Sequence, residues 1–416
     1  MERIERNVIR PVAEFMRQVD QSGALPPVYV MSSASADPVA TIDGREVLVF
    51  CSSNYLGLAT HPEVKRAVMD AVEIYGLGAN GSRLVSGTTD AHVALEEATA
   101  RLKGNEAAIA FPTGFMANSG TITALAYLPI FARMTGMPLG TSVAEMVVLG
   151  DALNHASIIE GRDAARARHA TYRHCDLVSL EEKLESWRGR RALIVTDAIF
   201  SMDGDIAPVP GIVELADAYG AQVLLDDAHG TGVLGRHGHG TLEHFGLDGA
   251  ASVLQMGTYS KAFGALGGFV TADAATVDYL RVAARSYMFS GAVPACVAAG
   301  ALTAMQIAER EPQRRVRLLR NRDYVAHELR ALGFEVLGDG TPIVPIVIGD
   351  EGIAGAMSDE LFARGVLAPC IRWPAVARGA SRIRLTLMAS HELDQLDRLL
   401  EGLADTGARH GVIPRA

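Results

Sequence analysis

One lysine stands where a side chain could act on a bound molecule. Lys261 lies in the stretch GTYSKAFGALGG, residues 257–268, directly after the apolar run 250–256. This pattern predicts that a strand ends here and that the backbone turns closely around a ligand. An amine in such a place can form a Schiff base with a carbonyl group. A solvated lysine beside a glycine-rich turn is the alternative, and this stretch alone does not separate the two interpretations.

Polar residues also follow the predicted strands in the middle of the chain. Strands that alternate with helical patterns indicate right-handed βαβ units and a parallel sheet, in which ligands bind at the carboxyl ends of the strands. Each residue alone is explained as simply by a loop histidine, a turn serine, a helix cap or a surface histidine. At successive strand ends they favour one shared site. The residues are His155, Ser201, Asp226, His229 and Lys261.

A helix start after another predicted strand favours an anion. Residues 107–111 are predicted to form a buried strand. A helix is predicted to begin at Thr113, Gly114 and Phe115 and to continue to Leu125. Backbone amides at a helix start, with the helix dipole behind them, attract phosphate. Every strand-to-helix turn has this polarity, so the assignment depends on the other groups that converge there. The glycine-dense loop 76–87 also favours a binding loop, although such a loop alone gives weak support.

Pyridoxal phosphate chemistry requires this combination of groups. A lysine holds the aldehyde, a carboxylate pairs with the protonated ring nitrogen, and a helix start binds the phosphate. Asp226, at the end of the apolar run QVLLDD, suits the carboxylate role. The imidazole of His155 suits a stacking contact with the ring.

Composition argues against several other classes of protein. The chain has 416 residues and a formal net charge of −10, which predicts no binding to nucleic acid or anionic membranes. We expect no integral membrane segment, because no apolar run reaches spanning length and residues 1–20 lack a signal-peptide core. The cysteines lack paired spacing, so we expect no metal site or disulfide framework and a reducing, cytoplasmic location. They are Cys51, Cys175, Cys296 and Cys370.

The predicted fold class is α/β, with a large domain around a mainly parallel sheet and a smaller α+β domain. We expect an N-terminal arm and helix over 1–55, a large cofactor-binding domain over 56–293 and a small domain over 294–416. A hairpin is expected around Asp43 and Gly44, and Pro129 and Pro138 are expected to interrupt the apolar span 126–148. Helical spacing in the arm predicts an apolar stripe buried on the same body or on a second subunit. The stripe is Ile4, Val8, Val12, Phe15, Met16 and Val19.

Seven segments resemble the α-oxoamine synthases, which are fold type I pyridoxal phosphate enzymes. The resemblance spans about residues 45–400, in one order, which makes it highly specific. Members of this family condense an amino acid with an acyl thioester, and most release carbon dioxide. The segments are SSNYLGL, TGFMAN, NHASIIEG, FSMDGDIAP, LDDAHGTGVLG, GTYSKAFGALGGF and RIRLTLMASHE.

The resemblance implies roles for the residues around the ring. Lys261 is implied to hold the cofactor and later to move the proton at the amino acid α-carbon. Asp226 is implied to pair with the ring nitrogen, and His155 to stack on the ring. Ser201 and His229 are implied to bind the ring hydroxyl.

The resemblance also implies contacts to the phosphate. Gly114 and Phe115 are implied to give backbone amides to it, helped by Thr258. Ser290, in MFSGAVP, is implied to reach the phosphate of a neighbouring subunit. A homodimer with shared active sites is the corresponding expectation.

Three residues are expected to contact the substrate. The resemblance implies that Arg384, in RIRLTLMASHE, grips the amino acid carboxylate and that Asn54 makes a second contact. Arg372, before Trp373 and Pro374, faces the substrate in one interpretation and is a surface arginine in the other.

The sequence motifs give a less direct indication of the substrates than of the cofactor. HGTGVLG resembles the alanine-using oxononanoate synthases, whereas GSRLVSG and GTYSKAFGALGGF resemble serine palmitoyltransferases. Alanine or serine is therefore expected before glycine, and apolar Leu84 favours an aliphatic acyl group over succinyl. Coenzyme A or an acyl carrier protein could carry the thioester. The alternatives are an aminotransferase or aldolase on the same fold, a 2-amino-3-ketobutyrate CoA ligase-like activity, and a non-catalytic partner subunit.

Overall fold

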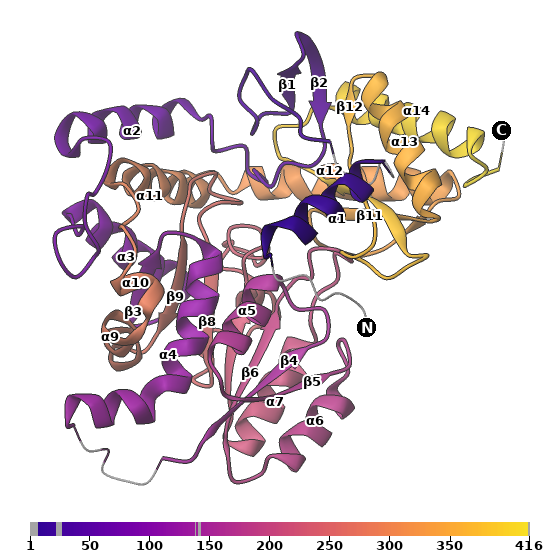
Figure 1. Ribbon diagram of the computed structural model, residues 1–416. Coiled ribbons are helices and arrows are strands. Elements are labelled where there is room, and N and C mark those ends of the chain that lie inside the picture. Colours follow the sequence, from indigo (N-terminus) through magenta and orange to yellow (C-terminus); the bar gives the residue numbers. More distant parts are fainter. Residues whose placement is uncertain (1–6, 22–26, 138, 140–142, 415–416) are drawn as a thin grey trace.

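The computed structural model describes residues 7–21, 27–137, 139 and 143–414, and its largest sheet has seven strands (Figure 1). The strands pair in the order β3-β9-β8-β7-β6-β4-β5. Strands β8, β7, β6, β4 and β5 are parallel, and β9 runs antiparallel to β3 and β8. This confirms the predicted α/β class. The strands are β3 (Ala107–Phe111), β4 (Met146–Asp151), β5 (Arg168–Tyr172), β6 (Arg191–Asp197), β7 (Gln222–Asp226), β8 (Val253–Thr258) and β9 (Gly268–Ala272).

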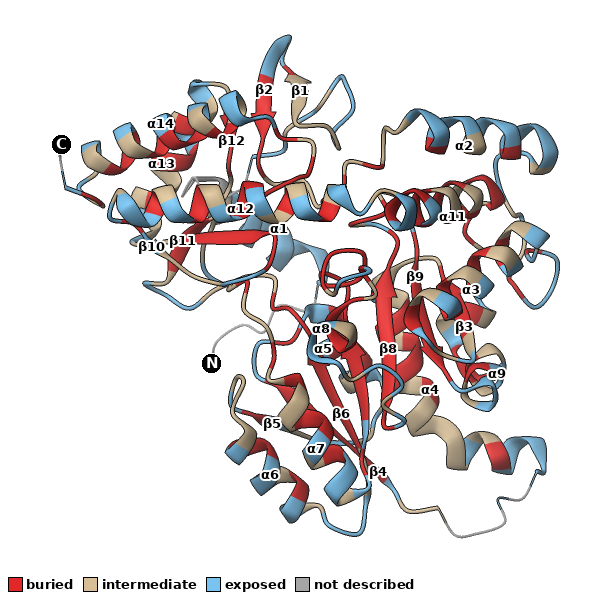
Figure 2. Cartoon of the chain, turned by 180° about the vertical axis from the view of Figure 1, so that it is seen from behind, coloured by how far each residue is buried: buried red, intermediate tan, exposed pale blue. Residues whose placement is uncertain are grey.

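The strands are apolar on both faces because helices cover both sides of the sheet (Figure 2). Side chains alternate between the faces along each strand. Along β6, Leu193 and Val195 share a core with α4 and α5, whereas Ile194 shares a core with α6 and α7. The helices are α4 (Gly114–Thr135), α5 (Ala156–Ala164), α6 (Leu177–Ser186) and α7 (Val209–Tyr219), with α8 (Thr241–Phe245), α9 (Ala274–Ala283) and α10 (Arg285–Met288) following them in the chain.

A second, antiparallel sheet of four strands forms in the C-terminal part, in the order β10-β11-β14-β13. Helix α11 packs against α2 and α3 and connects the two parts of the molecule. The elements are α2 (Pro62–Tyr75), α3 (Asp90–Lys103), α11 (Ala295–Arg310), α12 (Gln313–Ala331), β10 (Glu335–Val336), β11 (Ile343–Gly349), α13 (Glu351–Ala363), β13 (Cys370–Ile371), β14 (Ser381–Thr386) and α14 (Leu393–Arg409).

The predicted hairpin near residue 43 is confirmed. β1 (Val39–Ile42) and β2 (Arg45–Val49) are antiparallel, with Ile42 opposite Arg45. Asp43 and Gly44 have φ values of 49° and 73°, the left-handed pair that a two-residue hairpin requires. β2 also pairs in parallel with β12 (Val366–Leu367). Residues before 55 thus join a sheet with C-terminal residues, and the domain boundaries at 55 and 293 stay predictions.

The N-terminal helix forms as its spacing predicts, but its own chain does not cover its apolar stripe. Helix α1 spans Ile9–Gln21. Among the described residues of the stripe, Val12 and Phe15 are 55% and 63% exposed, Val8 and Met16 are also exposed, and Val19 is half-buried. Ile4 lies outside the described residues. Of the two predicted locations, the chain's own body therefore does not bury this stripe.

The prediction that Pro129 interrupts the span 126–148 is wrong. Pro129 lies inside the continuous helix α4. A proline lacks the N–H that would bind the carbonyl four residues earlier, here that of Leu125. The guanidinium Nη2 of Arg191 donates to the Leu125 oxygen at 3.2 Å instead. A side chain from β6 thus replaces the missing backbone bond. Pro138, the second predicted breaker, lies outside the described residues.

Because α4 is continuous, it is the one helix in the described part of the chain with the length and composition of a membrane span. The expectation that no apolar run reaches that length is therefore wrong on those two criteria. In the structure, α4 packs against α5, β9 and α9. Its buried side chains include Ala117, Ile122 and Ala124. This packing accounts for the apolar side chains in the first half of α4, whereas Ala132 is the one buried residue among the described residues 125–135.

A buried ion pair fixes the loop after β7. Lys103 Nζ lies 2.8 Å from Asp227 Oδ2, with 0% and 1% of the two side chains exposed. Asp227 also accepts a hydrogen bond from Thr241 N at 3.2 Å. An isolated charge at this depth would be expensive, so each partner depends on the other.

Lys103→Met will lower the free energy of unfolding by about 3–5 kcal/mol, because it leaves the Asp227 carboxylate buried without its cation. Urea unfolding followed by circular dichroism measures the change. Lys65→Met, the same substitution on the exposed face of α2, is the control and will unfold like the wild type. Equal stability of the two variants would contradict the role of the pair.

Candidate active site

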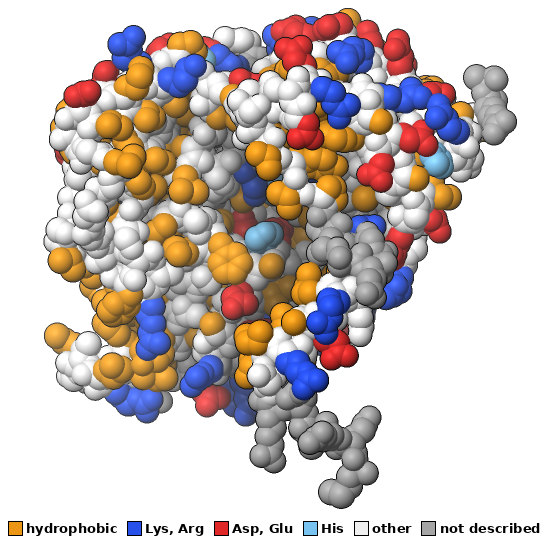
Figure 3. All heavy atoms as spheres, turned by 45° about the horizontal axis from the view of Figure 1, so that its top comes forward, with side chains coloured by type: hydrophobic (Ala, Val, Ile, Leu, Met, Phe, Trp, Pro, Cys, Tyr) orange, Lys and Arg blue, Asp and Glu red, His pale blue; other side chains and the backbone are white. Residues whose placement is uncertain are grey.

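The carboxyl ends of β6, β7 and β8 bring the predicted polar residues together at one edge of the central sheet. Asp197 ends β6, Asp226 ends β7, and Lys261 follows β8 by three residues. The pKa of Lys261 responds to both carboxylates, which places the three groups in one electrostatic environment. The space-filling view shows a hollow whose floor carries acidic, basic and histidine side chains (Figure 3).

Lys261 has the electrostatics of a reactive amine. Burial lowers the pKa of its ammonium group, because a low-dielectric environment disfavours the charge. The carboxylates of Asp226 and Asp197 partly offset this effect, and the guanidinium of Arg384 adds to it. The amine is therefore neutral at a lower pH than that of an exposed lysine, and a neutral amine is the nucleophilic form.

Asp226 is held by hydrogen bonds to both carboxylate oxygens. It is 4% exposed. Its Oδ1 accepts from Ala228 N at 3.0 Å, and its Oδ2 accepts from Asn118 Nδ2 at 2.6 Å. Asn118 lies in the second turn of α4 and also donates to Ser157 Oγ at 2.8 Å. Asn118, the last residue of the segment TGFMAN, thus orients the carboxylate and was not predicted from the sequence.

His155 is the N-cap of α5, and this role fixes its ring. Its Nδ1 accepts from Ser157 N at 3.2 Å and lies 2.8 Å from Ser157 Oγ. Burial lowers the pKa of His155, and the nearby Lys261 amine lowers it further, while Asp226 raises it. The ring is therefore neutral at physiological pH, and a neutral imidazole offers a flat face for stacking.

Asp197 belongs to the site and was missed from the sequence. It is 5% exposed, and its Oδ2 accepts from His155 N at 2.7 Å. Burial raises its pKa well above the ordinary range, and the neighbouring Asp226 raises it further. The signal was available, since Asp197 ends an apolar strand as Asp226 does.

His229 and Tyr55 form a buried pair near Lys261. Tyr55 Oη lies 2.6 Å from His229 Nδ1, and both residues are buried. Burial lowers the pKa of His229 well below its usual value, and Lys261 and Arg384 add to that shift. Tyr55 lies next to the predicted Asn54 but was not singled out from the sequence.

Arg384 reaches the site from the other sheet. It lies on β14, and its Nε donates to the backbone oxygen of Ser201. Its charge also affects the pKa values of Lys261 and His229. The structure therefore brings Ser201 and Arg384 together with the strand-end residues, and the site lies between the central and C-terminal sheets.

The start of α4 forms a cradle suited to an anion. Thr113 caps the helix by accepting from Met116 N at 3.1 Å, and the preceding N–H groups of Gly114 and Phe115 have no carbonyl within the helix. A Cβ on Gly268 would lie 2.5 Å from Gly114 Cα, so only glycine allows this close packing. Thr258 Oγ1 donates to Gly267 O at 2.7 Å beside it. The helix start, the amine and the oriented carboxylate fit pyridoxal phosphate.

The glycine-dense loop is held by a buried ion pair. Arg83 Nη1 and Nη2 contact the two carboxylate oxygens of Glu96 at 3.0 and 3.1 Å. A Cβ on Gly87 would lie 2.3 Å from the oxygen of Gly81. Leu84, at the tip, is half-exposed. The loop therefore presents an apolar side chain from a rigid base.

Asn54, which was predicted to contact the substrate, makes other contacts within the chain. Asn54 Oδ1 accepts from Leu58 N and Ala59 N at 3.0 and 3.2 Å, and its Nδ2 donates to Ala36 O at 2.8 Å. These bonds hold a turn, and the predicted substrate contact of Asn54 stays a prediction.

Two further predicted residues, Ser290 and Arg372, come from other segments of the chain. Ser290 Oγ lies 3.8 Å from Met116 Sδ of its own chain. Arg372 follows β13 and is half-buried. Their predicted contacts with a neighbouring subunit and with substrate stay predictions.

Comparisons with known proteins agree with this site. Residues 45–403 match the family model described as aminotransferase class I and II. The chain is 42% identical to an 8-amino-7-oxononanoate synthase of Symbiobacterium thermophilum, over 97% of this chain and 98% of that protein. It is also 42% identical to one of Geobacter sulfurreducens, over 97% and 100%.

Solved structures show the same architecture. A serine palmitoyltransferase of Sphingomonas wittichii superposes with a TM-score of 0.88 at 30% identity, over 98% of each chain. Another structure of serine palmitoyltransferase, with pyridoxal phosphate, has a TM-score of 0.90 at 31% identity, over 98% of this chain and 100% of that one.

The pH dependence of cofactor binding will report the environment of Lys261. The rate at which apoprotein combines with pyridoxal phosphate will rise through the lysine pKa, with a midpoint below that of a free lysine. Asp197→Asn will move the midpoint to lower pH, since it removes a charge that raises the pKa. Arg384→Gln will move it to higher pH, since it removes a charge that lowers the pKa. Stopped-flow absorbance measures the rates.

Asp278→Asn serves as the control, because this carboxylate is 71% exposed on α9. Its midpoint will equal that of the wild type. Shifts of Asp197→Asn and Arg384→Gln in the same direction would contradict the electrostatic assignment.

Proposed function

The chain belongs to the α-oxoamine synthase family of pyridoxal phosphate enzymes, and from this membership we propose that it joins an amino acid to an acyl thioester. The amino acid loses its carboxyl group as carbon dioxide, the acyl carbon forms a bond to the α-carbon, and the thiol leaves. The product is an α-amino ketone. One observation supports this function best: Lys261, Asp226 and Arg384, a base, a ring partner and a carboxylate-binding cation, surround one hollow.

Pyridoxal phosphate supplies an electron sink for the negative charge that develops at the amino acid α-carbon. Lys261 is proposed to hold the cofactor and to move the α-proton, and its lowered pKa suits that transfer. Asp226 presents an oriented carboxylate toward the ring nitrogen. His155 covers one ring face, and Ser201 and His229 are proposed to bind the ring hydroxyl. Gly114, Phe115 and Thr258 are proposed to bind the phosphate.

Arg384 is proposed to bind the carboxylate that the reaction removes. A guanidinium matches a carboxylate with two parallel hydrogen bonds. The Nε bond to Ser201 fixes the guanidinium from the central sheet side. With the carboxylate held in one orientation, the bond that breaks is also held in one orientation relative to Lys261.

The substrates are proposed from the names of the relatives. An 8-amino-7-oxononanoate has nine carbons, a ketone on carbon 7 and an amine on carbon 8. Breaking the bond between carbons 7 and 8 gives two fragments. One is a two-carbon amine, which is what remains of alanine after it loses carbon dioxide. The other is a seven-carbon acyl group with a terminal carboxylate. We therefore propose alanine and an aliphatic acyl thioester, carried by coenzyme A or an acyl carrier protein. The apolar Leu84 in the glycine-dense loop supports an aliphatic chain.

The working unit is proposed to be a homodimer with shared sites. The exposed stripe of α1 needs a cover, and Phe115 and Phe289 are exposed near the phosphate cradle. Ser290 lies in the same segment as Phe289 and is proposed to reach the partner's phosphate site. A cytoplasmic location is proposed because all four cysteines are free.

A substrate panel tests the proposed reaction. Alanine, serine and glycine, labelled in the carboxyl carbon, are each incubated with acyl thioesters of increasing length. Labelled carbon dioxide will appear only when a thioester is present, most rapidly with alanine, and mass spectrometry will show the α-amino ketone. Lys261→Ala will lose this activity and the borohydride-dependent attachment of the cofactor. Transfer of the amino group to a keto acid, without thioester or carbon dioxide, would instead indicate an aminotransferase.

Arg384→Gln will weaken the binding of the amino acid substrate but not that of the thioester substrate. Its KM for the amino acid will rise by roughly 10–100-fold, since a charged hydrogen bond is worth about 1.5–3 kcal/mol. Its KM for the thioester will change little. The control is Arg188→Gln, whose side chain is 65% exposed on the distant α6 end. A variant with unchanged amino acid KM would exclude Arg384 as the carboxylate ligand.

A further inference from the structure

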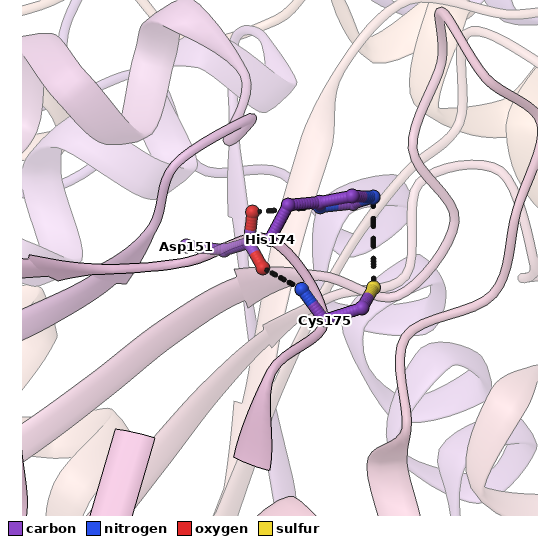
Figure 4. A group of neighbouring side chains, drawn as sticks. All are labelled: Asp151, His174 and Cys175. Carbon is purple, nitrogen blue, oxygen red and sulfur yellow. Dashed lines mark hydrogen bonds and ion pairs between the residues drawn. The ribbon is translucent and has the colours of Figure 1, made fainter. Parts of the chain in front are cut away.

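A second cluster of titratable side chains lies beside the site but takes no part in its chemistry (Figure 4). Asp151 ends β4, and His174 and Cys175 lie in the turn between β5 and α6. Asp205 comes from the turn that follows Ser201. Three turns at the carboxyl edge of the sheet therefore meet at one imidazole.

Three atoms of this cluster form a triangle of metal-binding size. His174 Nε2 lies 2.9 Å from Asp205 Oδ2 and 3.6 Å from Cys175 Sγ. Cys175 Sγ lies 3.6 Å from Asp205 Oδ2. Tetrahedral zinc, with bonds of about 2.0–2.3 Å to nitrogen, oxygen and sulfur, separates its ligand atoms by roughly 3.2–3.6 Å. Only the nitrogen–oxygen edge must lengthen, by a few tenths of an ångström.

Asp151 supplies the support that a metal-binding histidine usually has. Its Oδ1 lies 2.9 Å from His174 Nδ1, the ring nitrogen on the far side from the triangle. The carboxylate is itself fixed by Leu153 N and Cys175 N, each at 2.8 Å. A carboxylate on Nδ1 leaves Nε2 with a lone pair and orients it toward the ion.

The backbone of Cys175 is unusual and serves the same cluster. Its φ of 52° is left-handed, which non-glycine residues seldom adopt. In this conformation its N–H contacts Asp151, while its thiol lies beside His174 and Asp205. Such strain persists where the surroundings require it.

Two carboxylates make the cluster attractive to a cation, and solvent can reach it. These carboxylates face the imidazole of His174, with Asp151 Oδ1 and Asp205 Oδ2 each 2.9 Å from a ring nitrogen. Asp205 Oδ1 is buried without a hydrogen-bond partner among the described residues. The side chains of His174 and Asp205 are 28% and 34% exposed, which leaves a path from solvent.

We propose that His174 Nε2, Cys175 Sγ and Asp205 Oδ2 bind a divalent transition metal ion, with zinc the best match to this mixed set of ligands and water as the fourth ligand. The imidazole nitrogen and the thiol bind the ion in their deprotonated forms, so metal binding competes with protons. The ion has a structural role: it ties the turn 200–205, whose Ser201 oxygen holds Arg384, to the ends of β4 and β5.

Metal titration of the holoenzyme tests this site. After removal of metals with a chelator, Zn²⁺ is titrated against a chromophoric chelator, and Co²⁺ is followed by visible absorbance and a thiolate charge-transfer band. We expect one equivalent per chain, the charge-transfer band and a raised melting temperature. Cys175→Asn will lose the band and weaken Zn²⁺ binding by more than about 100-fold. Asparagine tolerates a positive φ, so this variant keeps the turn.

Two controls locate the ion. Cys370→Ser removes another half-buried free thiol and will bind as the wild type does. His237→Asn disrupts a second group, His237, His239 and Glu243, and will also retain binding. Absence of a stoichiometric ion in the wild type, equal affinity in Cys175→Asn, or loss of the ion in His237→Asn would each overturn the proposal.

Discussion

The mutual attraction of buried opposite charges at one sheet edge is the interaction on which the site depends. The carboxylates of Asp226 and Asp197 offset part of the effect of burial on the pKa of Lys261. The amine in turn lowers the pKa of Asp197, which burial and Asp226 raise. Burial of an unpaired charge is costly, so the three groups must be close and rigid. A parallel sheet provides this rigidity, because the carboxyl ends of neighbouring strands meet at one edge.

Helix α4 contributes to this site at two positions along its length. Its first turn offers backbone N–H groups to an anion, and one turn later Asn118 holds the carboxylate of Asp226. Both functions need a fixed helix axis. Contacts with the sheet provide it, including the bond from Arg191 that compensates for Pro129. The apolar length of the helix therefore reflects its place between the sheet and its neighbouring helices.

The substrate side of the hollow comes from the C-terminal sheet. Arg384 crosses to the Ser201 turn, so the proposed carboxylate-binding cation and the proposed base, Lys261, belong to different sheets. The proposed metal at His174 and Asp205 would brace the same turn from the opposite side. Catalytic geometry in this protein thus rests on how firmly one turn, residues 200–205, is held between two sheets.

The sequence alone predicted the α/β class and the strand ends at which Lys261 and Asp226 meet, because periodicity and glycine-rich turns report local backbone and burial. It did not identify Asn118, nor the tolerance of Pro129 inside a helix, since each depends on partners that strand pairing brings near from distant positions. The same holds for the metal cluster: its histidine and cysteine are adjacent in the chain, but Asp205 lies 30 residues beyond the cysteine. Local patterns specify elements, whereas the packing of the whole chain decides which side chains meet.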